Sequence, residues 1–121
     1  MTEPKTLLVV DDSSIARRMI KRLVTKRRPD WEILEASGAD QAIEISGCTD
    51  IDCFSVDLNM PGKDGLELIA ILKESHPDRP MALLTANIQD ATHERSQELA
   101  VPCFNKPVTE ETVDKLLESL A

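Results

Sequence analysis

Short apolar runs alternate with longer amphipathic segments along the whole chain. Each apolar run has the length of a strand that is buried on both faces of a parallel sheet. The runs cover residues 6–10, 31–36, 52–56, 81–85 and 101–104. The run at 31–36 alternates in polarity, so we expect it to lie near a sheet edge.

Apolar residues recur at helical spacing in the segments that follow these runs. Ser13 or Ser14 can cap the first predicted helix, which Pro29 ends, and Thr109 can cap the last. The other predicted helices cover residues 39–46, residues 66 to about 76, and residues 90–99. The apolar stripe of the first helix consists of Ile15, Met19, Ile20, Leu23 and Val24.

Five strand–helix units in series predict an α/β fold with a doubly wound, five-stranded parallel sheet and helices on both faces. We expect right-handed crossovers and the flavodoxin-like strand order 2-1-3-4-5. The length of 121 residues suits one domain, covering residues 1–121. Only fourteen residues follow Pro107, so we expect no output domain.

Composition narrows the class of protein. Fourteen Lys and Arg against twenty-two Asp and Glu give a net charge of −8. This charge argues against binding to nucleic acids and against binding to anionic membranes. No apolar stretch approaches the ~18 residues of a membrane helix. Three cysteines without a C-x-x-C pair indicate a reducing compartment, so we expect a cytoplasmic protein.

Polar residues follow four of the predicted strands, and these are the candidates for chemistry. They are Asp11 and Asp12, Asp57, Thr85 and Lys106. Ligands of open parallel sheets bind beyond the carboxyl ends of the strands, so we expect these residues to meet at one edge. Each residue alone is explained as well by a strand end, a turn, a cap or a solvated surface charge; the joint placement favours a site.

Three clustered carboxylates repel one another, and a hard divalent cation such as Mg²⁺ explains the cluster most easily. Asp57 is then a candidate carboxylate nucleophile toward phosphorus. Phosphoryl transfer needs charge neutralisation, which Lys106 can provide, and the hydroxyl of Thr85 can donate to a phosphoryl oxygen. The backbone carbonyl of Asn59 is a further candidate metal ligand.

The sequence resembles the receiver domains of two-component response regulators, and the stand-alone chemotaxis-type receivers in particular. The resemblance extends from Leu7 to about Leu120 and depends on five motifs in order. They are Val9-Val10-Asp11-Asp12, Asp57-Leu58-Asn59-Met60-Pro61, Asp64-Gly65, Thr85-Ala86 and Lys106-Pro107.

The resemblance implies that Asp57 accepts a phosphoryl group from the phosphohistidine of a histidine kinase or of its phosphotransfer domain. It also implies that Asp12, Asp57 and the Asn59 carbonyl hold Mg²⁺, with Asp11 acting largely through a bound water. Thr85 and Lys106 would contact the phosphoryl group, and the Lys106–Pro107 bond would be cis. Such a protein catalyses only its own phosphorylation and dephosphorylation and, as a monomer, signals by binding an unknown downstream protein.

Cys103 departs from the family pattern. Receivers usually carry a Tyr or Phe three residues before the lysine, and this aromatic ring swings inward when the residue equivalent to Thr85 engages phosphate. Cys103 is too small for such a movement, so the resemblance leaves the output surface in doubt. The neighbouring Phe104 is a poor substitute because it should point to the opposite face of the strand.

Three alternative functions stay open on the sequence. A receiver that only drains phosphate, as a sink or adaptor, would keep the same site. An aspartate-nucleophile phosphatase typically has a second acid two residues after the nucleophile, where this chain has Asn59. A flavin carrier would need a phosphate-binding loop rich in Ser and Thr after the first strand.

The basic cluster of Arg17, Arg18, Lys21 and Arg22 is either a solvated face or a docking surface for an acidic partner.

Overall fold

The computed structural model describes residues 4–86 and 88–120, and within them five parallel strands form one sheet. The strand order is β2-β1-β3-β4-β5, which confirms the predicted fold class. The strands are β1 (Thr6–Val10), β2 (Glu32–Ala36), β3 (Cys53–Asp57), β4 (Met81–Thr85) and β5 (Cys103–Asn105). The helices are α1 (Ser14–Arg27), α2 (Ala39–Cys48), α3 (Gly65–Ser75), α4 (Asp90–Glu98) and α5 (Glu110–Leu120).

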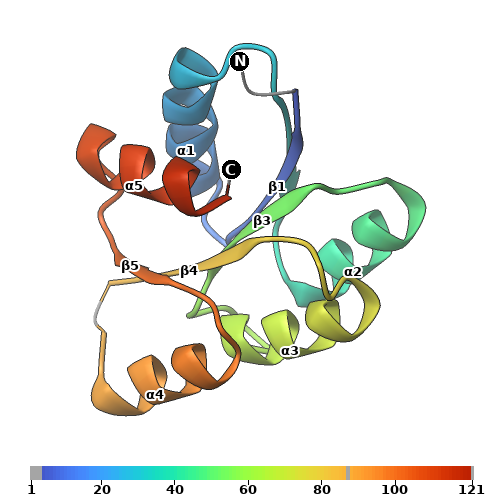
Figure 1. Cartoon of the computed structure of the whole chain (residues 1–121), viewed down its shortest axis with the longest axis vertical. Helices are drawn as coiled ribbons and strands as arrows, with labels where there is room; N and C mark the ends of the chain where they lie inside the picture. Colours follow the sequence, from blue (N-terminus) through green and yellow to red (C-terminus); the bar gives the residue numbers. More distant parts are fainter. Residues whose placement is uncertain (1–3, 87, 121) are drawn as a thin grey trace.

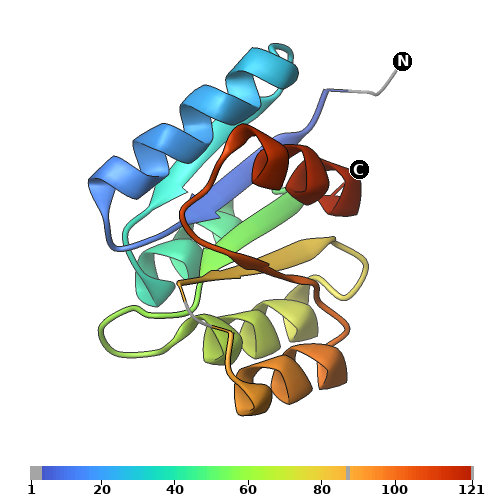
Figure 2. The same cartoon turned by 90° about the vertical axis from the view of Figure 1, so that its left-hand side faces the viewer.

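Helices cover both faces of the sheet, as Figures 1 and 2 show: α1 and α5 lie on one face, and α2, α3 and α4 on the other. The residues of β1 alternate between the two cores because successive strand residues point to opposite faces. Leu7 and Val9 pack in the core under α1 and α5, whereas Leu8 and Val10 pack in the core under α2 and α3. All four are buried, as expected for a central strand.

The apolar stripe predicted for α1 is only partly correct. Ile20 and Val24 are buried and Leu23 is half-buried, but Ile15 and Met19 are 73% and 47% exposed. At about 100° per residue, Ile15 and Met19 lie roughly 140° and 100° around the helix from Ile20. The buried stripe is therefore narrower than the sequence suggests, and two large apolar side chains are left in solvent.

The strand boundaries differ slightly from those predicted, and one difference matters for the site. The third strand runs one residue further than predicted, so that Asp57 is its last residue, opposite Leu84 of β4 in the sheet register. The backbone of Asp57 is fixed by its pairing with β4, and that of the preceding Val56 by pairing with β1 as well as with β4. Helix α4, in contrast, has only Ser96 buried, which reflects its polar sequence. In the described part of the chain no helix is long and apolar enough to cross a membrane.

Candidate functional site

The sheet brings the ends of β1, β3 and β4 together with the segment after β5. Val10 pairs with Val56, which places Asp11 and Asp12 next to Asp57. The backbone N–H of Lys106 donates to the carbonyl oxygen of Thr85 at 2.8 Å, and this bond joins the end of β5 to the end of β4. Residues separated by up to 95 positions in the sequence therefore share one edge.

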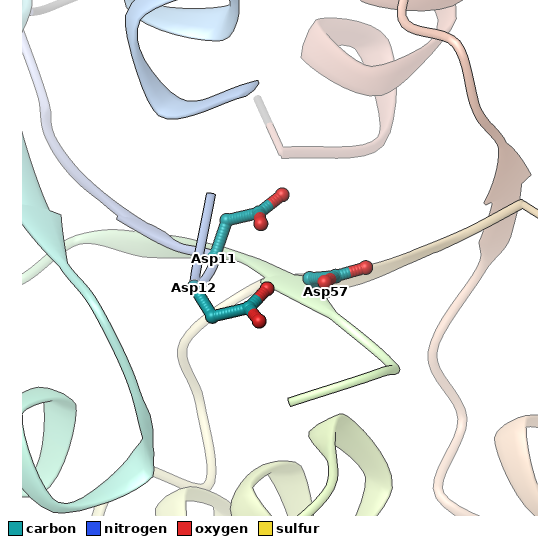
Figure 3. Close-up of side chains that lie close together, drawn as sticks. All are labelled: Asp11, Asp12 and Asp57. Atoms are coloured by element: carbon teal, nitrogen blue, oxygen red, sulfur yellow. The ribbon is translucent and has the colours of Figure 1, made fainter. Parts of the chain in front are cut away.

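Three carboxylates form the centre of this edge. Asp11, Asp12 and Asp57 each offer an oxygen atom, and these oxygens all lie within 4.8 Å of one another. Figure 3 shows the three side chains at the ends of β1 and β3. Asp11 and Asp57 are buried, at 1% and 5% exposure, while Asp12 is exposed. Two of the three negative charges are thus largely withdrawn from water.

Lys106 is the positive charge of the site. Its Nζ lies 2.6 Å from Oδ2 of Asp11 and 3.1 Å from Oδ1 of Asp57. Because one ammonium faces three carboxylates, the cluster keeps a formal charge of −2 when all groups are ionised. Burial opposes protonation of the Lys106 amine, but the bonds to Asp11 and Asp57 outweigh it and raise the pKa of Lys106. The lysine therefore stays charged.

The pKa of Asp57 is raised above that of an ordinary aspartate, although Lys106 is near. Burial is the largest cause, followed by repulsion from Asp11; the hydrogen bond to Lys106 lowers the pKa but does not compensate. The ionised form of Asp57 is therefore disfavoured in this site, and additional positive charge would stabilise it.

Asp11 is fixed by groups that the sequence analysis did not identify. Its Oδ1 accepts a hydrogen bond from the backbone N–H of Ser13 at 2.9 Å. Arg17 donates to the carbonyl oxygen of Asp11 at 2.6 Å and pairs with Glu35 of β2 at 3.1 Å. The sequence predicts Arg17 to be part of a solvated face or a docking surface, but its side chain is only 16% exposed and holds the end of β1. No sequence signal distinguishes it from the neighbouring Arg18.

The start of α3 lies directly against the backbone of Asp57. A Cβ atom on Gly65 would clash with the carbonyl oxygen of Asp57 and lie 2.9 Å from its carbonyl carbon, so only glycine fits. Asp64 caps the helix: it accepts from the N–H of Glu67, and the side chain of Glu67 accepts from the N–H of Asp64. The Asp64-Gly65 motif therefore has two structural roles, a helix cap at Asp64 and a close backbone approach at Gly65, and motif spacing alone predicts neither.

The other predicted site residues lie around this centre. Thr85 is buried at 1% exposure as the last residue of β4, and the Lys106–Pro107 peptide bond is cis, as expected. Asn59 is exposed in the loop between β3 and α3. The predicted role of its carbonyl depends on the resemblance.

Cys103 and Phe104 point to opposite faces of β5, as predicted. Cys103 packs against the core under α2 and α3, and Phe104 packs against the core under α1 and α5. Burial raises the pKa of the Cys103 thiol, so the thiolate needed for redox chemistry is disfavoured. Phe104 is therefore not positioned to replace the missing aromatic ring on the Cys103 face.

The donor set suits a hard divalent cation. Carboxylate oxygens are the ligands that Mg²⁺ prefers, and a cation would offset both the residual charge of −2 and the raised pKa of Asp57. Exposed Asp12 leaves the cluster open to solvent, so that waters or a phosphoryl oxygen can complete the coordination shell.

Comparison with known proteins identifies the family. The family model of the response regulator receiver domain matches residues 7–118, and the chain belongs to this family. Receiver domains accept phosphoryl groups from histidine kinases, generally use Mg²⁺, and bind downstream targets. Over 73 residues the chain is 41% identical to the nitrate/nitrite response regulator protein NarL of Escherichia coli K12, a match that covers 60% of this chain and 33% of NarL. The chain spans about a third of the length of the curated relatives it matches.

Solved structures share the whole fold. The chemotaxis protein CheY4 of Vibrio cholerae superimposes with a TM-score of 0.88 at 21% identity, covering 98% of this chain and all of CheY4. The response regulator protein TrrA of Thermotoga maritima, solved in complex with Mg²⁺-BeF, gives 0.85 at 25% identity and covers 97% of this chain and 99% of TrrA. These similarities agree with the strand order of the sheet.

Proposed function

We propose that this chain is a phosphorylatable receiver in which Asp57 accepts the phosphoryl group from the phosphohistidine of a histidine kinase or of its phosphotransfer domain. The phosphorylated form then binds a downstream protein, in a chemotaxis-like or another two-component pathway of the cytoplasm. We further propose that the single domain acts as a monomer. Family membership supports the class of function, and the pathway is left open.

Each residue of the site has a role in this proposal. An oxygen of Asp57 attacks phosphorus, while Lys106, which already contacts Asp57, neutralises charge on the phosphoryl group. The Thr85 hydroxyl donates to a phosphoryl oxygen. Asp12, Asp57 and the Asn59 carbonyl would hold Mg²⁺, with Asp11 acting through a water. When bound, Mg²⁺ would supply further positive charge against the phosphoryl oxygens.

One observation carries the proposal: a single ammonium lies 2.6 Å and 3.1 Å from two buried carboxylates inside a cluster of three. A stabilising ion pair would need one acid per base, whereas this arrangement leaves two carboxylates uncompensated. TrrA was solved in complex with Mg²⁺-BeF, which supports the same ligands for this chain.

Intact mass spectrometry tests the proposal. The protein is incubated with Mg²⁺ and acetyl phosphate, and we expect one phosphoryl adduct that is absent with EDTA. Asp57→Asn should abolish the adduct, whereas the control Asp50→Asn, in an exposed pair with Arg79, should retain it. Turnover of phosphomonoesters without an adduct would contradict the receiver proposal and favour the phosphatase alternative.

Cys103 favours a second candidate, in which the chain is a phosphate sink without its own output. A small side chain at the position of the usual aromatic residue cannot report phosphorylation by a large movement. Capture of binding proteins with and without beryllofluoride separates the two functions. A relay binds a partner in the beryllofluoride state only; a sink gains no partner.

A further inference from the structure

Arg17 lies at the junction of β1, β2 and α1. Its Nη1 donates to the backbone carbonyl oxygen of Asp11 at 2.6 Å, and its Nε lies 3.1 Å from Oε1 of Glu35. The side chain is only 16% exposed, although arginine is mostly a surface residue. A planar guanidinium that is largely withdrawn from water and bound at two of its nitrogens has a fixed orientation.

The carbonyl group of Asp11 lies where the pairing of β1 with β2 ends. The N–H of Asp11 donates to the carbonyl oxygen of Ala36 at 3.1 Å, and Ala36 is the last residue of β2. In a parallel ladder the next donor would come from beyond Ala36, but there the chain turns into α2, which begins at Ala39. Because Asp11 is 1% exposed, its carbonyl needs a donor from the protein, and Arg17 supplies it.

The bond from Arg17 also fixes the start of Asp12. The carbonyl oxygen of Asp11 and the Cα atom of Asp12 belong to one planar peptide unit, so a donor that holds the oxygen also sets the direction in which the Asp12 side chain leaves the backbone. Asp12 is exposed, so its carboxylate is not held by a surrounding core. Its place beside Asp11 and Asp57, shown in Figure 3, therefore depends on the backbone.

We propose that Arg17, oriented by Glu35, is a positioning residue for Asp12 and thereby sets the affinity of the acidic cluster for Mg²⁺. This inference rests on the proposed function, which makes Asp12 a ligand of Mg²⁺, and it adds one residue of α1 and one of β2 to that site. Removing a group that orients a metal ligand typically weakens metal binding by about 10–100-fold. We expect the lower end of this range, because Arg17 holds the ligand through the backbone and not through its carboxylate.

Charge alone predicts the opposite effect. Arg17 is a positive charge near three carboxylates, so its removal makes the potential at the cluster more negative and should strengthen the binding of a cation. Loss of the bond to Asp11 should instead weaken that binding. The sign of the change in Mg²⁺ affinity therefore separates a positioning role from an electrostatic one, and a loss of folding stability does not by itself change the affinity of the folded protein.

Isothermal titration calorimetry with Mg²⁺ as the only added ligand tests the proposal. We expect Arg17→Ala to raise the Kd for Mg²⁺ about tenfold. The matched control Arg18→Ala removes the same charge from an exposed neighbour in α1, and its Kd should be equal to that of the unaltered protein or slightly lower.

The kinetics of adduct formation with acetyl phosphate give a second readout. In Arg17→Ala the Mg²⁺ concentration that gives the half-maximal rate should rise in parallel with the Kd. The rate at saturating Mg²⁺ should stay within about twofold of the unaltered protein, because Asp57 and Lys106 are unchanged. A low rate that saturating Mg²⁺ does not restore would contradict a role confined to positioning the metal ligand.

A second variant, Glu35→Ala, keeps the test independent of the folding of Arg17→Ala. Glu35 lies on the edge strand β2 and its side chain is 36% exposed, so its loss should leave the fold intact. We expect Glu35→Ala to raise the Kd about threefold where Arg17 is present and by less than about 1.5-fold in the Arg17→Ala background, because Glu35 acts through Arg17. Equal effects in the two backgrounds would contradict the role of Glu35.

The outcomes separate this inference from the proposed function. A Kd that is unchanged or lowered in Arg17→Ala, while the unaltered protein binds Mg²⁺ and forms the adduct, would overturn the positioning role alone. If Arg17→Ala does not fold, an unchanged Kd in Glu35→Ala overturns it. An unaltered protein that neither binds Mg²⁺ nor forms an adduct would overturn the proposed function together with this inference.

Discussion

The Nζ of Lys106 lies closer to Asp11, at 2.6 Å, than to Asp57, at 3.1 Å, so that one ammonium joins the end of β1 to the end of β3. Asp11 is also fixed by the N–H of Ser13 and, through its carbonyl, by Arg17. Asp57 is therefore the less restrained of the two acids that Lys106 contacts. This difference agrees with the proposal that Asp57, and not Asp11, accepts the phosphoryl group.

Replacing Lys106 by alanine should destabilise the metal-free protein. The change leaves Asp11 and Asp57 as buried carboxylates without a counter-charge, which costs about 2 kcal/mol, less than for a fully buried pair because 21% of the lysine side chain is exposed. Urea unfolding measures the loss. Mg²⁺ should stabilise Lys106→Ala more than the unaltered protein, because the cation then faces the full charge of three carboxylates.

The matched control for this variant is Lys115→Ala. Lys115 pairs with Glu111 on the exposed surface of α5, and such a pair contributes about 0.5 kcal/mol or less. Equal losses in the two variants would contradict the role of Lys106 as the charge that holds the cluster.

Asp57→Asn should stabilise the metal-free protein near neutral pH. Burial, then repulsion by Asp11, raises the pKa of Asp57 in the folded state above its unfolded value. The folded state therefore binds this proton more tightly. The resulting stability is fully present below about pH 4 and is lost as the pH rises through the raised pKa. Asparagine does not ionise, so it avoids this loss.

Urea unfolding at about pH 4 and about pH 7 checks the sign of the effect. The stability difference between Asp57→Asn and the unaltered protein should be small at the lower pH and should favour the variant at the higher pH. Mg²⁺ should narrow it at pH 7 by stabilising ionised Asp57. A variant that is less stable at pH 7 without metal would contradict the raised pKa.

Gly65→Ala should distort the end of β3. The new Cβ atom would clash with the carbonyl oxygen of Asp57 and lie 2.9 Å from Cα of Leu58, and these are backbone atoms that cannot move aside. We expect a loss of about 2–4 kcal/mol in unfolding free energy, as for an overpacked core, and slower adduct formation at Asp57. Urea unfolding and intact mass spectrometry measure the two effects.

Gly47→Ala is the control for this close approach. Gly47 lies within α2 and a Cβ atom there would meet nothing within 4 Å, so alanine should stabilise the helix by about 0.5–1 kcal/mol. If both variants behaved alike, the contact between the start of α3 and Asp57 would not be what requires glycine at position 65.

The sequence predicted the fold well because its signals are local and strong. Buried strands such as residues 6–10 and 81–85 are continuous apolar runs between turn residues, and the structure has them with the same bounds. The parallel direction of the strands follows from the alternation of strands and helices along the chain. Strand ends are less well defined by sequence, which is why the sequence predicts Asp57 just after the third strand although it is the last residue of β3.

The candidate site was predicted as a set of residues but not as a set of contacts. Strand ends identify Asp11, Asp12, Asp57, Thr85 and Lys106, because topology brings such positions to one edge. The side chain of Arg17 and the close approach of Gly65 depend on helix orientation and backbone packing, which hydrophobic pattern does not encode. For the same reason the sequence did not distinguish exposed Ile15 and Met19 from buried Ile20.

Ala100 forms the turn that ends α4, and glycine should serve better there. Its φ of 57° is in the left-handed region, which costs an L-residue about 1 kcal/mol. The N–H of Val101 donates to the carbonyl of Ser96, and the N–H of Ala100 donates to the carbonyl of Gln97. These two bonds are the Schellman pattern, in which a helix ends at a residue in the left-handed conformation. Ala100→Gly should therefore raise the unfolding free energy by about 0.5–1 kcal/mol.

Ala70→Gly, on the exposed side of α3, is the opposite control and should lower the unfolding free energy by about 1 kcal/mol, because φ is helical there and glycine adds only chain entropy. Opposite signs for the same chemical change would assign the Ala100 effect to its backbone conformation. Helix α4 follows β4, whose last residue is Thr85. The rate of adduct formation in Ala100→Gly therefore also reports whether a more stable α4 affects the site. Ala100 precedes β5, at the end of the sheet opposite the strand ends that carry the site, so we expect that rate to stay within about twofold of the unaltered protein. A large change in rate would indicate that the stability of α4 and the reactivity of Asp57 are coupled.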